Sequence, residues 1–154
     1  MRLAAALSHR ADLATRADAL AQRAYRAALT QEGTTPVDDP AALLAEHEAV
    51  LAELEALVVR INLTNASTDV DGVPLTAALA RRDTLRHRHR MLTSLAEQST
   101  PRADRMRGAE LRMLPTIDVA GLHAAADRVA KELRELDLRI QEVNWTTELM
   151  LTSR

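Results

Sequence analysis

The chain has 154 residues and a mass of 16.9 kDa, enough for one domain spanning residues 1–154 with a single core. Its apolar content of 47% comes mainly from 24 leucines and 29 alanines, and only Tyr25 and Trp145 are aromatic. Leucine and alanine favour helices, so the composition excludes an all-β fold. Four glycines argue against a glycine-loop nucleotide-binding fold. The absence of cysteine excludes disulfides, thiolate nucleophiles and cysteine-based metal centres.

The first residues do not have the pattern of a secretory signal, because His9 and Arg10 follow only five apolar residues. No apolar run elsewhere approaches the roughly 18 residues of a membrane span. We therefore expect a cytoplasmic protein with no membrane contact. The net charge is only −2, so charge alone names no partner.

Two helices are predicted in the first part of the chain. Over residues 2–31, leucine and alanine recur at helical spacing. Asp39 followed by Pro40 predicts an N-cap with proline in the first turn, where its missing N–H costs nothing. The second helix, about 40–65, alternates steps of four and three residues, which is the coiled-coil pattern. Its seam consists of Leu43, His47, Val50, Leu54, Leu57, Ile61 and Thr64.

A break and a third helix follow. Asp71-Gly72 is a turn signal, so residues 68–74 are expected to form a turn or a miniature hairpin. Thr76 is then expected to cap a helix that runs to about Ser99.

The last part of the chain predicts an irregular segment and a long final helix. Residues 101–117 have no helical periodicity. Asp118 is expected to cap a helix extending to about Met150. Its seam runs through Leu122, Ala126, Val129, Leu133, Leu136, Ile140, Val143, Thr147 and Met150.

These elements predict an all-α fold: a four-helix, partly coiled-coil bundle of long helices with a small irregular, hairpin-like insert. Leu44, Leu51 and Val58 widen the apolar face of the second helix beyond what one neighbour covers. We therefore expect the protein to form a homo-oligomer.

Three stretches resemble a family of small bacterial proteins that carries the name septicolysin. They are residues 60–68 (RINLTNAST), 74–83 (PLTAALARRD) and 139–149 (RIQEVNWTTEL). The resemblance implies an all-helical, oligomeric protein of long coiled helices. It implies no established activity, and therefore no catalytic residues.

An arginine stripe is the strongest local anomaly. Residues 81–112 carry 9 basic and 4 acidic side chains, and Arg82, Arg86 and Arg90 share one helix face, with Arg102 and Arg105 as possible extensions. The stripe is a candidate anion-binding surface, for a phosphorylated ligand, a nucleic acid or an acidic protein. The lack of nearby aromatic residues for stacking argues against nucleic acid. Ion pairing with acidic residues of the second and last helices is the alternative.

A polar cluster near two helix ends is the second candidate: Asn62 and Asn65 on the second helix, Asn144 and Trp145 on the last. Polar residues within a helical interface can fix its register, and Trp145 can cover an apolar gap. The alternative is a shallow pocket in which the amides bind a ligand.

No other pattern indicates chemistry. His87 and His89 are two residues apart and point in different directions, so they do not chelate one metal ion together, and no Glu-x-x-His motif is present. No nucleophile motif or phosphate loop is found. We expect no metal and no cofactor. The sequence favours a non-enzymatic assembly or interaction protein that binds itself or a protein partner; an anion-binding module centred on residues 81–90 is the alternative.

Overall fold

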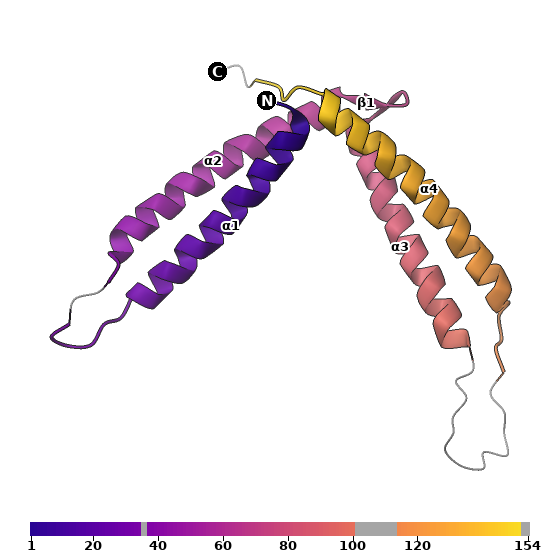
Figure 1. Cartoon of the computed structure of the whole chain (residues 1–154), viewed down its shortest axis with the longest axis horizontal. Coiled ribbons are helices and arrows are strands. Elements are labelled where there is room, and N and C mark those ends of the chain that lie inside the picture. The colour runs from indigo at the N-terminus through magenta and orange to yellow at the C-terminus, as the bar shows by residue number, and fades with distance from the viewer. Residues whose placement is uncertain (35–36, 101–113, 152–154) are drawn as a thin grey trace, which may run out of the picture. The chain divides into compact units, whose positions relative to one another are not determined.

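The computed structural model describes residues 1–34, 37–100 and 114–151, and within them the fold is helical apart from one two-stranded ribbon (Figure 1). The predicted all-α class is confirmed. The chain divides into two compact units: Met1–Pro74 with Gln141–Arg154, and Leu75–Ile140. In chain order the elements are α1 (Leu3–Ala27), α2 (Pro40–Ser67), β1 (Asp69–Val70), β2 (Val73–Pro74), α3 (Leu75–Ser99) and α4 (Val119–Thr146).

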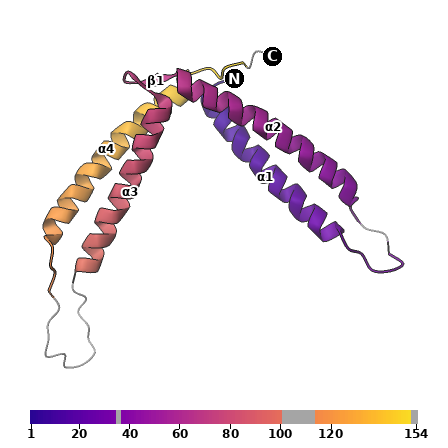
Figure 2. The same cartoon turned by 180° about the vertical axis from the view of Figure 1, so that it is seen from behind.

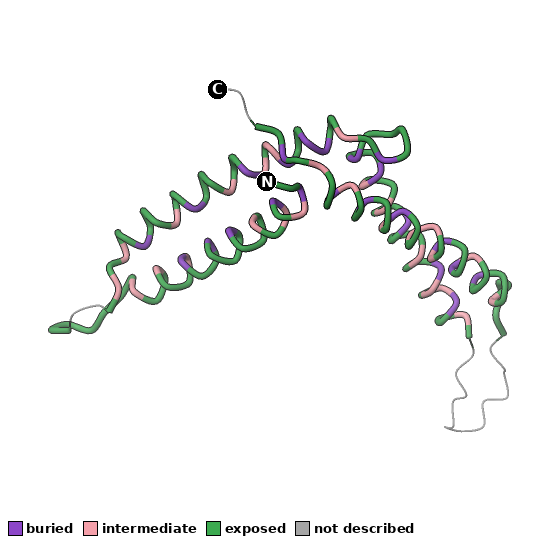
Figure 3. Tube along the Cα trace, turned by 45° about the horizontal axis from the view of Figure 1, so that its top comes forward, coloured by how far each residue is buried: buried purple, intermediate pink, exposed green. Residues whose placement is uncertain are grey.

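The first unit is built on an antiparallel hairpin of α1 and α2, which lie side by side in both views (Figures 1 and 2). Asp39 caps α2 as predicted, because its Oδ1 accepts a hydrogen bond from the Ala41 N–H at 2.9 Å. Buried positions recur along one side of each helix (Figure 3). The buried apolar residues of the hairpin are Leu3, Ala6, Leu13, Ala17, Leu20, Leu43, Val50, Leu57 and Ile61.

The break after α2 is a miniature hairpin, as predicted. β1 and β2 pair antiparallel, with Val70 opposite Val73. Asp71 and Gly72 connect them with φ angles of 53° and 80°, the two consecutive positive values that a tight two-residue turn requires. The expectation that Thr76 caps α3 is wrong: the helix begins one residue earlier, at the fully buried Leu75, so Thr76 lies in its first turn.

The second unit is an antiparallel hairpin of α3 and α4, again side by side in both views (Figures 1 and 2). Asp118 caps α4 as predicted, because its Oδ1 accepts a hydrogen bond from the Gly121 N–H at 3.0 Å. The buried apolar residues of the unit are Leu75, Ala78, Leu85, Leu92, Ala96, Leu122, Ala126, Val129, Leu136 and Ile140.

The prediction that α4 continues to about residue 150 is wrong, because the helix ends at Thr146. The next residues are extended and pair with the beginning of the chain. The Leu3 N–H donates to the Thr147 carbonyl and the Leu149 N–H donates to the Met1 carbonyl, both at 2.9 Å. The residues after α4 therefore join the first unit through backbone hydrogen bonds to the N-terminal residues, and not as a continuation of the helix.

Candidate interaction surface

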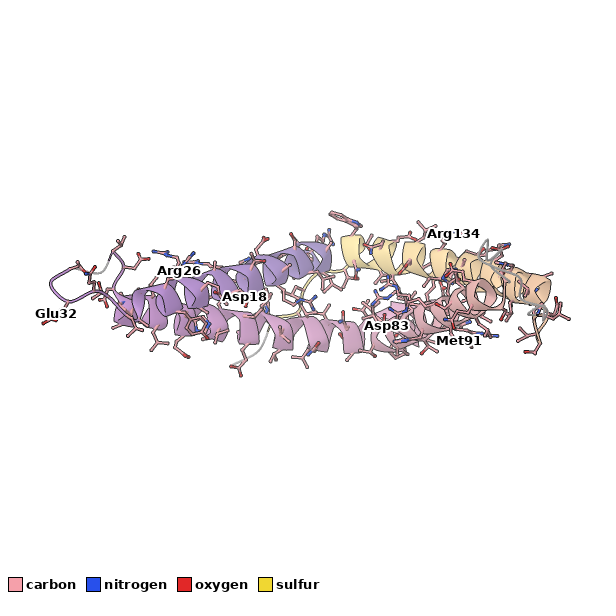
Figure 4. All side chains as sticks on the ribbon, turned by 90° about the horizontal axis from the view of Figure 1, so that it is seen from below. Asp18, Arg26, Glu32, Asp83, Met91 and Arg134 are labelled. Carbon is pink, nitrogen blue, oxygen red and sulfur yellow. The ribbon has the colours of Figure 1, made fainter. Side chains whose placement is uncertain are left out.

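The arginine stripe lies on α3 and is engaged by carboxylates of the second unit. The Arg82 guanidinium donates to Oδ1 of Asp83, with N–O distances of 2.9 and 3.0 Å. Arg86 lies 3.3 Å from Oδ2 of Asp137 on α4 and 3.7 Å from Oδ1 of Asp83. Arg82 also approaches Asp137, at 4.0 Å. Asp83 is labelled in Figure 4.

Arg90, the third residue of the stripe, and Arg81 beside it also have partners. Arg81 contacts Glu132 on α4 at 2.5 Å, and Arg90 lies 3.0 Å from Nδ1 of His87. Carboxylates of the unit therefore compensate Arg81, Arg82 and Arg86, whereas His87 brings no negative charge to Arg90; the ion pairs form with the last helix and not with the second. Arg102 and Arg105 lie outside the described residues.

The polar cluster divides into buried and exposed members. Asn65 and Asn144 are buried, with exposed fractions of 9% and 7%. Asn62 is exposed, and Trp145 keeps 68% of its surface in solvent. The four residues therefore do not form one continuous layer.

Thr64, next to Asn65, has a role that sequence reasoning missed. Its hydroxyl donates to the Arg60 carbonyl at 2.8 Å and accepts from the Met150 N–H at 3.0 Å. Arg60 Nε donates to the Met150 carbonyl at 2.9 Å, and the Ser67 hydroxyl lies 3.0 Å from the Met150 sulfur. These contacts join residues more than eighty positions apart, so no local sequence signal marks them. The α2 end thus holds the extended segment after α4.

Within the described part of the chain, nothing at these positions indicates a ligand or metal. No fully buried side-chain nitrogen or oxygen lacks a hydrogen-bond partner there. No group of three or more His, Cys, Asp or Glu residues there is arranged to hold a metal ion. No helix among the same residues is long and apolar enough to cross a membrane.

One edge of the α1–α2 hairpin, the charged edge, is closed by ion pairs spaced seven residues apart. The α1 members are His9, Arg16 and Arg23, and their respective partners are Glu53 at 3.0 Å, Glu46 at 2.6 Å and Asp38 at 2.7 Å. The partner numbers fall as the α1 numbers rise, which fixes the antiparallel register. The His9 pair is ionic only when the imidazole is protonated.

The Arg23–Asp38 pair lies at the loop end of this edge. Arg23 donates to both Asp38 oxygens, at 2.7 and 3.3 Å. This hydrogen bonding lowers the pKa of the Asp38 carboxyl and raises the pKa of the Arg23 guanidinium. The pair also borders a shallow hollow lined by Arg26, Leu29 and Val37. Asp38 neutralises Arg23, so Arg26 is the remaining cation of the lining.

The opposite edge of the hairpin, the apolar edge, is open. Each of its residues follows a buried residue by one position and therefore lies about 100° further around its helix. Because the helices are antiparallel, this rotation brings the residues of α1 and those of α2 to the same side of the hairpin. The α1 stripe, after Ala6, Leu13 and Leu20, is Leu7, Ala14 and Ala21. The α2 stripe, after Leu43, Val50 and Leu57, is Leu44, Leu51 and Val58.

The α2 stripe is poorly covered. Leu44 is 56% exposed and Leu51 is 37% exposed, whereas Val58 is half-buried. On α1, Ala14 is exposed and Leu7 and Ala21 are half-buried. A row of leucines in solvent is the feature of this unit that most clearly indicates an interaction.

A model of a family of unknown function, DUF6847, matches residues 10–149. The chain is also similar to a functionally unknown conserved protein from Corynebacterium diphtheriae, whose crystal structure has a TM-score of 0.92. The sequences are 38% identical, and the match covers 97% of this chain and 99% of that one. No curated protein matches.

The resemblance to septicolysin-named proteins is therefore wrong, since neither match points to that family. Two of the stretches that suggested it, 60–68 and 74–83, are mainly helical, and 139–149 includes the end of α4. All three lie inside residues 10–149. Because the family model matches this range, which is most of the chain, the chain belongs to DUF6847, a family of unknown function.

Proposed function

We propose that this protein is a non-enzymatic interaction protein that assembles into a helical homo-oligomer through the apolar edge of its α1–α2 hairpin. The observation that carries the proposal is the exposure of Leu44 and Leu51 in a row beside the buried seam. Fully burying a leucine side chain stabilises a protein by about 1.5–3 kcal/mol relative to leaving it exposed. Covering this edge therefore supplies a driving force for association.

The spacing of the α2 residues also supports association. The seam and the adjacent stripe give α2 an apolar face wide enough for two neighbours, and α1 supplies one of them. A second hairpin placed on the apolar edge completes a four-helix, coiled-coil-like bundle. This bundle of two copies is part of the proposal and differs from the predicted bundle, which consisted of the four helices of one chain.

An anion-binding module on α3 is the competing function. Arg82 and Arg86 each contact Asp83 and Asp137, so an incoming anion must displace carboxylates that already compensate them. Arg88 is exposed and has no ion-pair partner among the described residues, but a single arginine gives little affinity. The ion pairs favour the assembly proposal.

Native mass spectrometry of the untagged protein, with a denatured control, tests the proposal. A closed multiple of the 16.9 kDa chain at micromolar concentration is expected. A single-chain mass would overturn the proposal. Additional mass per chain would identify a ligand or a second protein, and self-association would then no longer be the main function.

A further inference from the structure

We infer that the occupant of the apolar edge is a second copy of this chain, with the α2 stripe of each copy packed against the α1 stripe of the other. This arrangement has a two-fold axis parallel to the helices, so both hairpin loops lie at the same end. The inference rests on the proposed function and specifies its interface.

The sizes of the two stripes are complementary. The α2 stripe carries two leucines and a valine, whereas the α1 stripe carries Ala14 and Ala21 in addition to Leu7. Dense packing between helices requires large side chains opposite small ones. Two α1 stripes facing each other would leave space beside the alanines, and two α2 stripes would place leucine against leucine. The exchanged pairing matches large with small where Leu44 meets Ala14 and Ala21, which neither like-with-like pairing does.

The register of the hairpin strengthens this match. The pairs His9–Glu53 and Arg16–Glu46 set which residues of α1 and α2 are level with each other. In that register Leu51 is level with Ala11, midway between Leu7 and Ala14. Leu44 is level with Asp18, midway between Ala14 and Ala21.

A two-fold axis parallel to the helices preserves these levels between copies. Each α2 leucine therefore enters the gap between two α1 stripe residues of the other copy, which is knobs-into-holes packing. Each stripe extends over fifteen residues, or fourteen steps of about 1.5 Å, so the contact is about 21 Å long.

The charges beside the stripes favour the same pairing. Glu48 and Glu55 flank the α2 stripe and are exposed, so two α2 stripes face to face would bring four carboxylates together. The corresponding positions on α1, four residues after Leu7 and Ala14, are Ala11 and Asp18, so this flank carries one carboxylate. At each helix contact the exchanged pairing therefore brings two carboxylates of one copy beside one of the other, fewer than the four of an α2–α2 contact.

Cross-linking of single-cysteine variants tests the arrangement, because the chain has no cysteine of its own. Ala14→Cys and Glu48→Cys are both exposed and level with each other in the hairpin register. The two proteins are mixed unfolded, refolded together and treated with a short bifunctional maleimide. We expect a covalent dimer in the mixture, at least fivefold more abundant than in either variant alone. A matched pair beside the charged edge, Asp12→Cys with Ala49→Cys, should give no dimer.

Circular dichroism confirms that each variant is folded, and native mass is measured on the same samples. If either variant cross-links to itself as efficiently as the mixture does, like helices face each other and the inferred arrangement is wrong, although self-association remains. If an oligomer forms and the mixture gives no covalent dimer, the interface lies elsewhere and the inference is again overturned. If the native mass is that of one chain, both the inference and the proposed function fail.

Discussion

The two helical hairpins of this protein share a seven-residue frame and differ at one edge. In α3, Ala78, Leu85 and Leu92 are buried at steps of seven, as Ala6, Leu13 and Leu20 are in α1. The position after Leu85 is Arg86, which contacts Asp137 of α4, the residue after the buried Leu136. The corresponding positions of the first hairpin carry alanine, leucine and valine.

In both hairpins the buried seam residues and the residues that directly follow them have different roles. The buried seam determines that two helices pack, and both hairpins have such a seam. The residue that directly follows each seam residue determines whether the edge of the helix pair is closed by polar contacts or left apolar and exposed. Arg86 and Asp137 close that edge of the α3–α4 hairpin with an ion pair. Leu51 and its neighbours leave the α1–α2 edge exposed, which is the reason for assigning the interaction to the first unit.

The largest expected effect comes from placing a charge on the apolar edge. Leu51→Glu puts a carboxylate into the centre of the α2 stripe, where association would bury it without a partner. We expect the oligomer to dissociate into single chains at micromolar concentration, with helix content retained. Native mass spectrometry and sedimentation velocity measure the change.

The matched control is on the other hairpin. Leu138 of α4 is 71% exposed, more than Leu51, yet it lies away from the seam. Leu138→Glu should therefore leave the native mass unchanged. If both variants dissociated the oligomer equally, association would not depend specifically on the apolar edge of the α1–α2 hairpin, and the contrast between the two hairpins would be wrong.

A smaller effect is expected at the α2 end. Thr64→Val keeps the shape of the side chain but removes the oxygen that accepts from the Met150 N–H. The bond is only part-buried, since Met150 is 43% exposed, so the free energy of unfolding should fall by about 0.5–1.5 kcal/mol in urea titrations. Thr84→Val in α3 is the control, because the exposed Thr84 hydroxyl only donates to the Ala80 carbonyl of its own helix. If both substitutions cost the same, the Met150 contact does not hold the extended segment.

A still smaller effect tests the closed edge of the second hairpin. Asp137→Asn removes the charge that Arg82 and Arg86 share, and Glu46→Gln removes the partner of Arg16 in the first hairpin. Exposed ion pairs contribute about 0–1 kcal/mol, so both losses should be small. Asp137→Asn should cost more, because Asp137 and Arg82 are the less exposed residues. The cost should shrink between about 0.1 M and about 1 M salt, since the screening length falls from about 10 Å to about 3 Å. A larger loss from Glu46→Gln would contradict this order.

The features that sequence alone predicted are the local ones. Asp39 and Asp118 cap helices because a carboxylate next to the first turn accepts from its free N–H groups. Asp71-Gly72 forms the turn because both residues adopt positive φ. These signals depend on a few adjacent residues and require no knowledge of the tertiary structure.

What the sequence did not predict depends on distant contacts. The seam pattern continues past Thr146, so it predicted helix where residues 147–151 pair instead with the N-terminal residues. Thr64 was recognised as a polar seam position, but its bond to Met150 joins distant parts of the chain. The arginine stripe and its candidate partners on the second and last helices were visible in the sequence, whereas the choice of Asp137 for Arg82 and Arg86 depends on the α3–α4 packing.

The smallest effect concerns the charged edge and depends on pH. The pKa of Asp38 is lowered by its hydrogen bonds from Arg23, so the folded state favours the ionised carboxyl. A lowered folded-state pKa contributes stability above the ordinary aspartate pKa of about 3.9, and this contribution is lost as pH falls through the folded value. In Asp38→Asn, stability should therefore be slightly lower at pH 7 and should decline less steeply below about pH 4. Thermal unfolding between neutral and acidic pH measures the slope, with Asp12→Asn, an exposed aspartate of the same hairpin, as control. If both variants followed the wild-type slope, the Arg23–Asp38 pair would not stabilise the loop end of the charged edge.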